Sequence, residues 1–240
     1  MGWWLRWVMV GAIVLAPAVA TAGGGTAAAR AAYKKGVRLG NDGKIDEAIA
    51  AFREALRLSP KMFRAALDLG QAYAMRHRWP EALAAYARAV RLQPSSAKAQ
   101  VGMGKVLLKL RVPAKAVEHL RKATQIKKDM LVAWHLLGRA LVRLERYDEA
   151  IEALSQALGL DNDNVDVTVD LGDAYYRKED YDQAVRTFTT ATRLDAKSAA
   201  AWLGLGLALR RSGKRQQAVD ALEKACKLGH KGACRQARMP

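Results

Sequence analysis

Residues 131–164 read LVAWHLLGRALVRLERYDEAIEALSQALGLDNDN, and this stretch decides the fold. It carries small residues at Gly138, Ala150 and Ala157 and a large apolar residue at Leu154. The same types of residue return every 34 positions over residues 29–232, six times and without an insertion. A period of this length is typical of tandem structural repeats that bury their apolar faces against one another. The sequence therefore predicts a repeat protein.

Four columns of the internal alignment define the repeat. The first is always glycine: Gly36, Gly70, Gly104, Gly138, Gly172 and Gly206. Two are always alanine: Ala48, Ala82, Ala116, Ala150, Ala184 and Ala218, then Ala55, Ala89, Ala123, Ala157, Ala191 and Ala225. The fourth is always large and apolar: Phe52, Tyr86, Leu120, Leu154, Phe188 and Leu222. The repeats span residues 29–62, 63–96, 97–130, 131–164, 165–198 and 199–232.

This pattern resembles the tetratricopeptide repeat, in which a Trp, a Leu-Gly pair, an Ala, a large residue and further small residues recur in order. In the fourth repeat the matching residues are Trp134, Leu137, Gly138, Ala150, Leu154 and Ala157. The resemblance implies an all-α fold, a right-handed superhelical solenoid of antiparallel helix pairs whose concave face is lined mostly by the first helix of each pair. Composition agrees, because strong helix formers dominate the chain and strand formers are few.

The repeat columns also predict how the two helices pack. We expect the repeat glycine of the first helix and the first repeat alanine of the second to meet where the two backbones come closest. The large apolar residue then fills the hole between the helices, and the next repeat covers it. Because one repeat cannot bury its own apolar face, the repeats must stack.

The first 22 residues, MGWWLRWVMVGAIVLAPAVATA, have the pattern of a secretory signal peptide. A single arginine precedes an apolar stretch, and residues 20–22 form a small-residue cleavage site, with a second candidate at residues 18–20. The apolar stretch at residues 7–20 is shorter than the roughly 20 residues that a membrane span needs. We therefore expect export to the periplasm, cleavage after residue 22 and no span in the mature chain. The alternative is an uncleaved membrane anchor. A flexible spacer is predicted at residues 23–28.

The charge of the chain is strongly positive. It has 40 Lys and Arg against 23 Asp and Glu, a net charge of +17, of which +14 lies on residues 29–232. Such a charge favours anionic partners, namely acidic protein segments, cell-wall polymers, lipid head groups or nucleic acid. The alternative is a basic surface that is merely solvated.

The family resemblance implies which side chains face the concave groove: positions 2, 5, 9, 12 and 13 of each first helix. Repeats three to six place basic residues there, at Lys98, Lys105, Lys109, His135, Arg139, Arg143, Arg177 and Arg210. Repeat five adds an acidic step with Asp166 and Asp173. Tyr33 and Val37 stand where chaperone-binding relatives carry a carboxylate-clamping Lys and Asn, so chaperone binding is not expected. We expect repeats three and four to bind an acidic segment.

Two cysteines, Cys226 and Cys234, end the last repeat. Within one helix they would lie about 12 Å apart, too far for a disulfide, but Gly229 and Gly232 mark a turn that lets them approach. The eight-residue spacing resembles the cysteine pairs of secreted Sel1-like repeat proteins, where such a pair joins adjacent helices, and exported chains meet an oxidising compartment. We expect a disulfide that pins a C-terminal cap and tail at residues 233–240. The alternative is two free thiols.

The sequence shows no catalytic or metal-binding constellation. Its four histidines neither share a helix face at ligand spacing nor pair with cysteine at zinc spacing. The glycine pairs in residues 102–104 and 204–206 lie inside predicted helices, without the strand–loop–helix context of a phosphate loop. The sequence therefore predicts no enzyme and no cofactor, but an exported scaffold for an acidic protein segment. The alternatives are a binder of anionic glycan or cell-wall polymer and a regulatory subunit of an envelope enzyme. Nucleic acid ranks below them because export argues against it.

Overall fold

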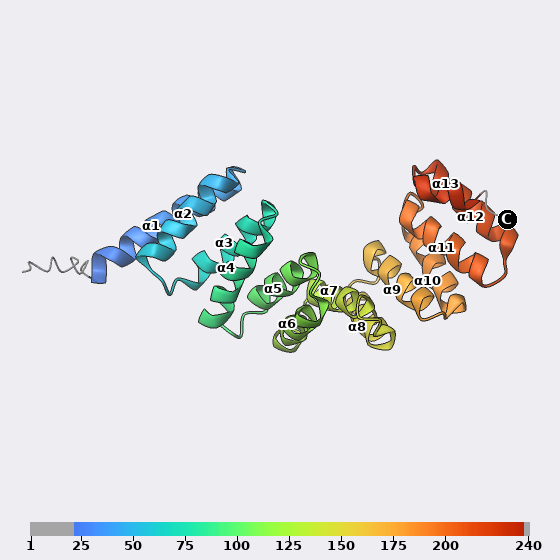
Figure 1. Ribbon diagram of the computed structural model, residues 1–240, viewed down its shortest axis with the longest axis horizontal. Coiled ribbons are helices and arrows are strands. Elements are labelled where there is room, and N and C mark those ends of the chain that lie inside the picture. The colour runs from blue at the N-terminus through green and yellow to red at the C-terminus, as the bar shows by residue number, and fades with distance from the viewer. Residues whose placement is uncertain (1–21, 238–240) are drawn as a thin grey trace, which may run out of the picture.

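The computed structural model describes residues 22–237, and all regular structure in that range is helical. The helices follow one another along an elongated, curved body (Figure 1). They are α1 (Ala22–Asn41), α2 (Ile45–Leu58), α3 (Phe63–Met75), α4 (Trp79–Leu92), α5 (Ala97–Lys109), α6 (Pro113–Ile126), α7 (Leu131–Val142), α8 (Tyr147–Leu160), α9 (Val165–Arg177), α10 (Tyr181–Leu194), α11 (Ala199–Arg211), α12 (Arg215–Lys227) and α13 (Lys231–Ala237). We call the odd-numbered helices from α1 to α11 the A helices and the even-numbered ones the B helices.

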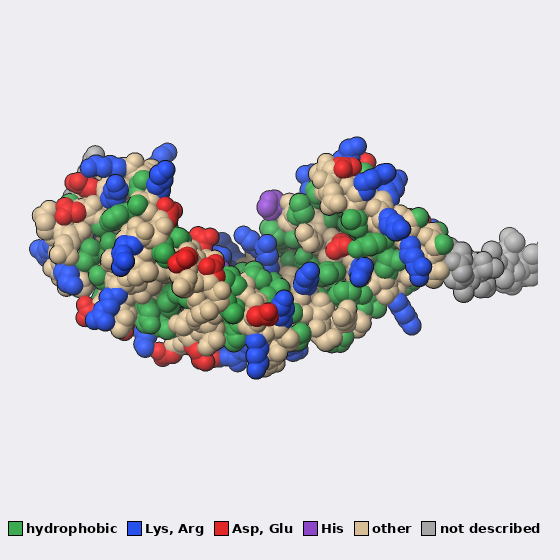
Figure 2. Space-filling view, turned by 180° about the vertical axis from the view of Figure 1, so that it is seen from behind, with side chains coloured by type: hydrophobic (Ala, Val, Ile, Leu, Met, Phe, Trp, Pro, Cys, Tyr) green, Lys and Arg blue, Asp and Glu red, His purple; other side chains and the backbone are tan. Residues whose placement is uncertain are grey.

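The curvature of the solenoid places the A helices on its inner side. Each A helix packs mainly on the B helix that follows it, and each B helix packs on the next A helix. Neighbouring A helices also approach one another from α3 onward, whereas neighbouring B helices make at most marginal contact. A stack that is closer on one side must curve toward that side, so the A helices line the concave face. Figure 2 shows the molecule hollowed between its two ends, with Lys and Arg side chains in the hollow.

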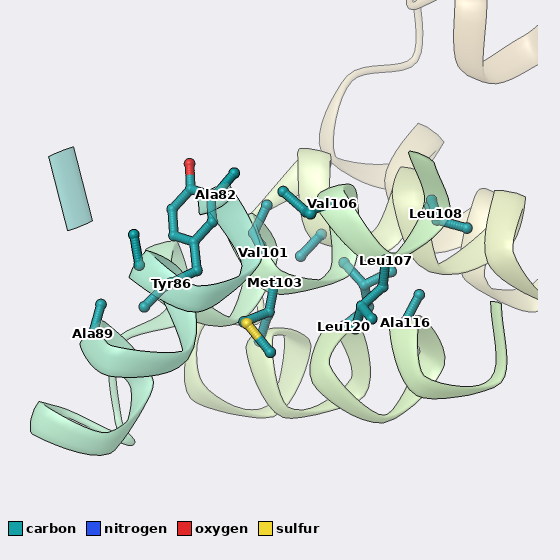
Figure 3. Packing of buried hydrophobic residues seen from close by; sticks show 14 of the residues in the cluster. Ala82, Tyr86, Ala89, Val101, Met103, Val106, Leu107, Leu108, Ala116 and Leu120 are labelled. Atoms are coloured by element: carbon teal, nitrogen blue, oxygen red, sulfur yellow. The ribbon is translucent and has the colours of Figure 1, made fainter. Parts of the chain in front are cut away.

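The repeat glycine makes room for the large apolar residue of its own repeat. A Cβ atom on Gly104 would lie 2.5 Å from Cγ of Leu120, a distance that real Cβ atoms do not adopt. Figure 3 shows Leu120 beneath α5, beside Ala116, and both residues are fully buried. The expected contact between the repeat glycine and the first repeat alanine is therefore not the closest one. Only at Gly206 does a backbone atom of the B helix, the carbonyl oxygen of Ala218, rank among the nearest atoms, at 3.1 Å.

Two aromatic residues of the large column require a second glycine from the next repeat. A Cβ atom on Gly102 would lie 2.4 Å from Cε1 of Tyr86, and one on Gly204 would lie 2.3 Å from Cε1 of Phe188. Each ring therefore lies against the helix backbone at a glycine. The glycine pairs of α5 and α11 serve this packing, in agreement with the rejection of a phosphate loop.

The turn between the A and B helices has the same conformation in every repeat. Its central residue has positive φ at Gly43 in the first repeat and Gly213 in the last. The middle repeats place non-glycine residues there, with φ between 57° and 67°, at His77, Arg111, Glu145 and Glu179. Such a conformation costs an L-residue about 1–2 kcal/mol, so four of the turns are held by the packing of the helices on either side.

The two ends of the described chain differ from the repeats. α1 begins at Ala22, so the prediction of a flexible spacer at residues 23–28 is wrong. Glycines disfavour a helix, but Ala27 and Ala28 are good helix formers and Ala29 is fully buried, so the helix packed from Ala29 onward extends back over this stretch. The predicted signal peptide, except its last residue, lies outside the described residues.

The C-terminal end is closed by the predicted disulfide, which is confirmed. Cys226 and Cys234 are bonded and join α13 to α12 across the turn at Gly229. Ala233 of α13 is fully buried against the apolar end of the last repeat. Between residues 22 and 237, no helix has the length and apolar character needed to cross a membrane.

Candidate functional site

The solvent face of α5 consists entirely of lysine. Ten of its 13 residues are buried, because Gly102 and Gly104 let the large residues of α4 and α6 close around the helix. The other three residues are Lys98, Lys105 and Lys109, and all are exposed. Their spacing of seven and four residues places them in one stripe about 16 Å long. None of the three has an ion-pair or hydrogen-bond partner within residues 22–237.

These lysines form one wall of an open space of about 600 Å³ on the inner face, which we call the α3–α5 hollow. The side formed by α3 and the start of α4 carries the apolar Leu67, Met75 and Trp79, together with the polar Gln71 and His77. Met75 is 55% exposed, which is unusual for a large apolar side chain inside a groove. The hollow thus sets three ammonium groups opposite an apolar surface.

Tyr86 of α4 lies at the bottom of the α3–α5 hollow. The side chain is nearly buried, with 8% of its surface exposed, and its ring lies between Gly70 and Gly102. Burial, and then the nearby Asp68 carboxylate, raise the pKa of Tyr86 to about 12. Its hydroxyl has no hydrogen-bond partner among residues 22–237. Figure 3 shows the oxygen at the edge of the buried cluster, pointing away from Ala89.

The cations of repeat four are engaged by the next repeat. His135 Nε2 lies 2.6 Å from Oδ2 of Asp170, and Arg139 Nε lies 3.5 Å from the same oxygen. Asp170 stands at position 6 of α9, outside the positions that the resemblance assigns to the groove, so sequence reasoning missed it. The sequence did contain a signal, because Tyr33 and Asp68 are separated by the same 35 residues as His135 and Asp170. In the structure Tyr33 donates a 2.8 Å hydrogen bond to Asp68.

The remaining predicted groove residues have other contacts or lie in other repeats. Arg143 donates a 2.7 Å hydrogen bond to the carbonyl oxygen of Leu108, so it links α7 to α5. Arg177 forms a 2.7 Å ion pair with Asp173 on the same helix. Arg210 is half-buried in the last repeat. Of the eight predicted residues, the structure therefore brings the three lysines together as unpaired charges.

The distribution of charge along the chain agrees with this localisation. Repeat three has nine Lys and Arg against two Asp and Glu, whereas residues 131–198 have eight against 13. Repeat three is therefore strongly basic, and three of its nine Lys and Arg form the lysine stripe. Of the predicted basic wall of repeats three and four, the lysines of repeat three are unpaired in the described structure, and Arg143 of repeat four reaches the same helix.

The histidines and acids form no metal site in the described part of the chain: no three His, Cys, Asp or Glu side chains there are placed to share a metal ion. His119 instead lies with Nδ1 2.7 Å from the buried side-chain oxygen of Gln100, whose amide donates a hydrogen bond to the carbonyl of Pro94. Burial lowers the pKa of His119, so the neutral imidazole is favoured in this structural contact.

Stacked helix pairs with an open inner face define a repeat scaffold of the α-solenoid class. Family models described as tetratricopeptide repeat match residues 33–97, 141–205 and 199–228. A model of subunit 3 of the anaphase-promoting complex, or cyclosome, matches residues 75–157. The chain belongs to the tetratricopeptide repeat family, and the prediction of family and fold is confirmed.

Solved structures with this fold span most of the chain. PilF of Pseudomonas aeruginosa has a TM-score of 0.72 at 18% identity, over 89% of this chain and 97% of its own. YrrB, described as a TPR protein with an unusual peptide-binding site, has a TM-score of 0.67 at 23% identity, over 79% of this chain and 98% of its own. MamA of Desulfovibrio magneticus RS-1 has a TM-score of 0.67 at 25% identity, over 71% and 96%. A search of curated proteins found no match.

Proposed function

We propose that this protein is an exported interaction scaffold that binds an extended acidic protein segment on its concave face. The lysine face of α5 is the observation that carries the proposal. Lys98, Lys105 and Lys109 are exposed, unpaired and aligned. An exposed ion pair contributes only about 0.2–1 kcal/mol, but three charges in a concave site attract an anion together. The likeness to YrrB, which is described as having a peptide-binding site, supports this role.

The apolar side of the hollow favours a protein segment over the other anionic partners. Leu67, Met75 and Trp79 offer contacts to aliphatic side chains, which a peptide has. A glycan or cell-wall polymer would use the lysines and leave the exposed Met75 in water. A scaffold role within an envelope complex, including a regulatory one, requires the same peptide-binding face.

The proposal is tested by reversing the lysine stripe. The variant carries Lys98→Glu, Lys105→Glu and Lys109→Glu, and the probe is a fluorescein-labelled peptide of alternating Glu and Ser. We expect the wild type to bind at low salt and to release the peptide as the screening length falls to about 8 Å near physiological ionic strength. The variant should bind at least about tenfold more weakly, as follows when two or three exposed pairs are lost.

The matched control changes the same charge on the other face of the same repeat, with Lys115→Glu, Lys122→Glu and Lys127→Glu. These lysines are exposed on or just after α6 and have no partner in the described structure. Equal affinity of the stripe variant and the wild type would overturn the proposal. Tighter binding of anionic cell-wall polymer than of any acidic peptide would replace the partner class.

Export is the second part of the proposal and rests on the sequence of residues 1–22 alone. Sequencing the N-terminus of the protein isolated from its host should give a chain that starts at Gly23. A chain that keeps residues 1–22 and sediments with membranes would support the anchor instead.

A further inference from the structure

We infer that the segment bound in the α3–α5 hollow alternates acidic and apolar residues. The inference rests on the proposed function and deepens it, because it specifies the sequence pattern of the ligand. It follows from three features of the hollow: the different chemistry of its two sides, the spacing of Lys105 and Lys109, and a phenol with a buried ring whose hydroxyl has no partner among residues 22–237.

The two sides of the hollow match the two faces of an extended peptide. Successive side chains of an extended chain point in opposite directions. A segment lying along α5 therefore presents every second side chain to the lysines and the others to Leu67 and Met75 of α3. Acidic residues on one face and apolar residues on the other satisfy both sides. A uniformly acidic segment would place carboxylates against the apolar side chains of Leu67 and Met75, which offer them no hydrogen-bond donor.

The spacing of Lys105 and Lys109 matches the distance between alternate residues of an extended chain. Lys105 and Lys109 are four residues apart in a helix, which is about 6 Å along its axis. Residues two apart in an extended chain are separated by about 6.6 Å. Two acidic side chains with one apolar residue between them therefore match these lysines. Lys98 lies about 10.5 Å before Lys105, or roughly three extended residues, so it adds positive charge beyond the matched pair without continuing the alternation.

Tyr86 adds a neutral donor at the bottom of the site. The ring is held by Gly70 and Gly102, since a Cβ on either would come within 2.8 Å or 2.4 Å of it. Its hydroxyl, from a residue more than nine-tenths buried, lies in the hollow without a partner. The raised pKa keeps the phenol protonated throughout the physiological range, so it can donate to a carboxylate. Gln71, exposed on α3, offers an amide to the peptide backbone.

The experiment compares three fluorescein-labelled nine-residue peptides by fluorescence anisotropy. One alternates Asp and Leu, one has the same composition with all Asp in a single block, and one alternates Asn and Leu. The full chain is used at fixed low salt. We expect the alternating acidic peptide to bind at least about tenfold more tightly than the block peptide, and the Asn peptide to bind weakest, because it lacks the charges.

Two substitutions then test the parts of the site. Tyr86→Phe keeps the ring and removes only the hydroxyl, so it should weaken the alternating peptide about threefold to tenfold, the usual effect of one hydrogen bond. Met75→Ser should weaken the alternating peptide and leave the block peptide unchanged. The matched control is Tyr73→Phe, since Tyr73 is equally buried on α3 but lines a hollow on the outer face. Thermal melts of each variant report whether the fold is kept.

The outcomes separate this inference from the proposed function. If the alternating and block peptides bind equally tightly and neither binds the lysine-stripe variant, the inferred alternation is overturned and the proposed basic groove is retained. Identical effects of Tyr86→Phe and Tyr73→Phe remove Tyr86 from the site. Failure of every acidic peptide to bind the wild type overturns both.

Discussion

Replacing Gly204 with alanine adds a single Cβ atom, whose effects on packing and on helix propensity should change stability in opposite directions. Gly204 lies inside α11, where alanine alone would be favoured by about 0.5–1 kcal/mol. In this structure the added Cβ would lie 2.3 Å, 2.5 Å and 2.6 Å from three ring carbons of Phe188. Phe188 is 3% exposed, so its ring has no free space into which to move. Overpacking of this kind typically costs 1–3 kcal/mol, so we expect Gly204→Ala to be destabilising by about that amount.

The matched control is the same substitution at Gly159 in α8. A Cβ there meets no atom within 4 Å. Gly159→Ala should therefore raise the free energy of unfolding by about 0.5–1 kcal/mol. One chemical change at two helical glycines is thus expected to have opposite signs, and the sign is set by the neighbouring ring.

A second substitution identifies that ring as the cause. Phe188→Leu removes the ring atoms that the new Cβ would meet, and the chain has a precedent, because Leu154 is followed at the equivalent position by Asp170 rather than glycine. Gly204→Ala should cost less in the Phe188→Leu background than in the wild type, with a coupling of about 0.5–3 kcal/mol. Urea unfolding followed by circular dichroism gives the free energy of unfolding of the wild type, of Gly204→Ala, of Phe188→Leu and of the double variant. Wild-type or higher stability of Gly204→Ala would refute the packing argument.

Two further predictions concern the cap and the turns. The double variant Cys226→Ser, Cys234→Ser should be less stable by about 2–3 kcal/mol, because the loop closure is lost. Its hydrogen exchange should become faster in α13 while α5 stays protected. Unchanged exchange in α13 would show that the disulfide does not hold the cap. Arg111→Gly and Glu179→Gly should each raise stability by about 0.5–1 kcal/mol, because both residues are exposed with positive φ. The control Lys122→Gly, inside α6, should lower stability by about 1 kcal/mol. A lower melting temperature for all three variants would contradict strain in the turns.

The helix pairs were predictable from sequence because each repeat carries its own packing instructions. A glycine and the large residue 16 positions later form one contact, and the contact recurs six times with the period. The atoms in contact do not follow from the columns alone, because the columns also allow the expected contact between the glycine and the first repeat alanine. The second glycine was visible in principle for two of the three aromatic repeats, since Gly102 follows Tyr86, and Gly204 follows Phe188, by the same 16 residues, whereas Asp68 stands at that position after Phe52.

The groove residues were predictable by position but not by state. Lys98, Lys105 and Lys109 follow from the helix positions that the resemblance provides. Whether a cation is free depends on the neighbouring repeat, and Arg139 and His135 are engaged by Asp170, which comes from the next A helix. The hollow itself was missed, because Tyr86 belongs to the packing pattern and because Trp79 stands outside the groove positions that the resemblance supplies.

The charge distribution supports the proposal that one repeat carries the binding site although the fold repeats six times. Residues 29–130 have 22 Lys and Arg against eight Asp and Glu, so this half would attract an acidic segment, while residues 131–198 have an acidic excess and would repel it. Within the basic half, α5 alone turns a solvent face made only of unpaired lysines toward an apolar wall. The packing glycines of α5 contribute to this arrangement, because they let neighbouring helices pack closely enough to bury all the residues of α5 except the three lysines. The constraint that builds the solenoid thereby also isolates the three charges that we propose bind the partner.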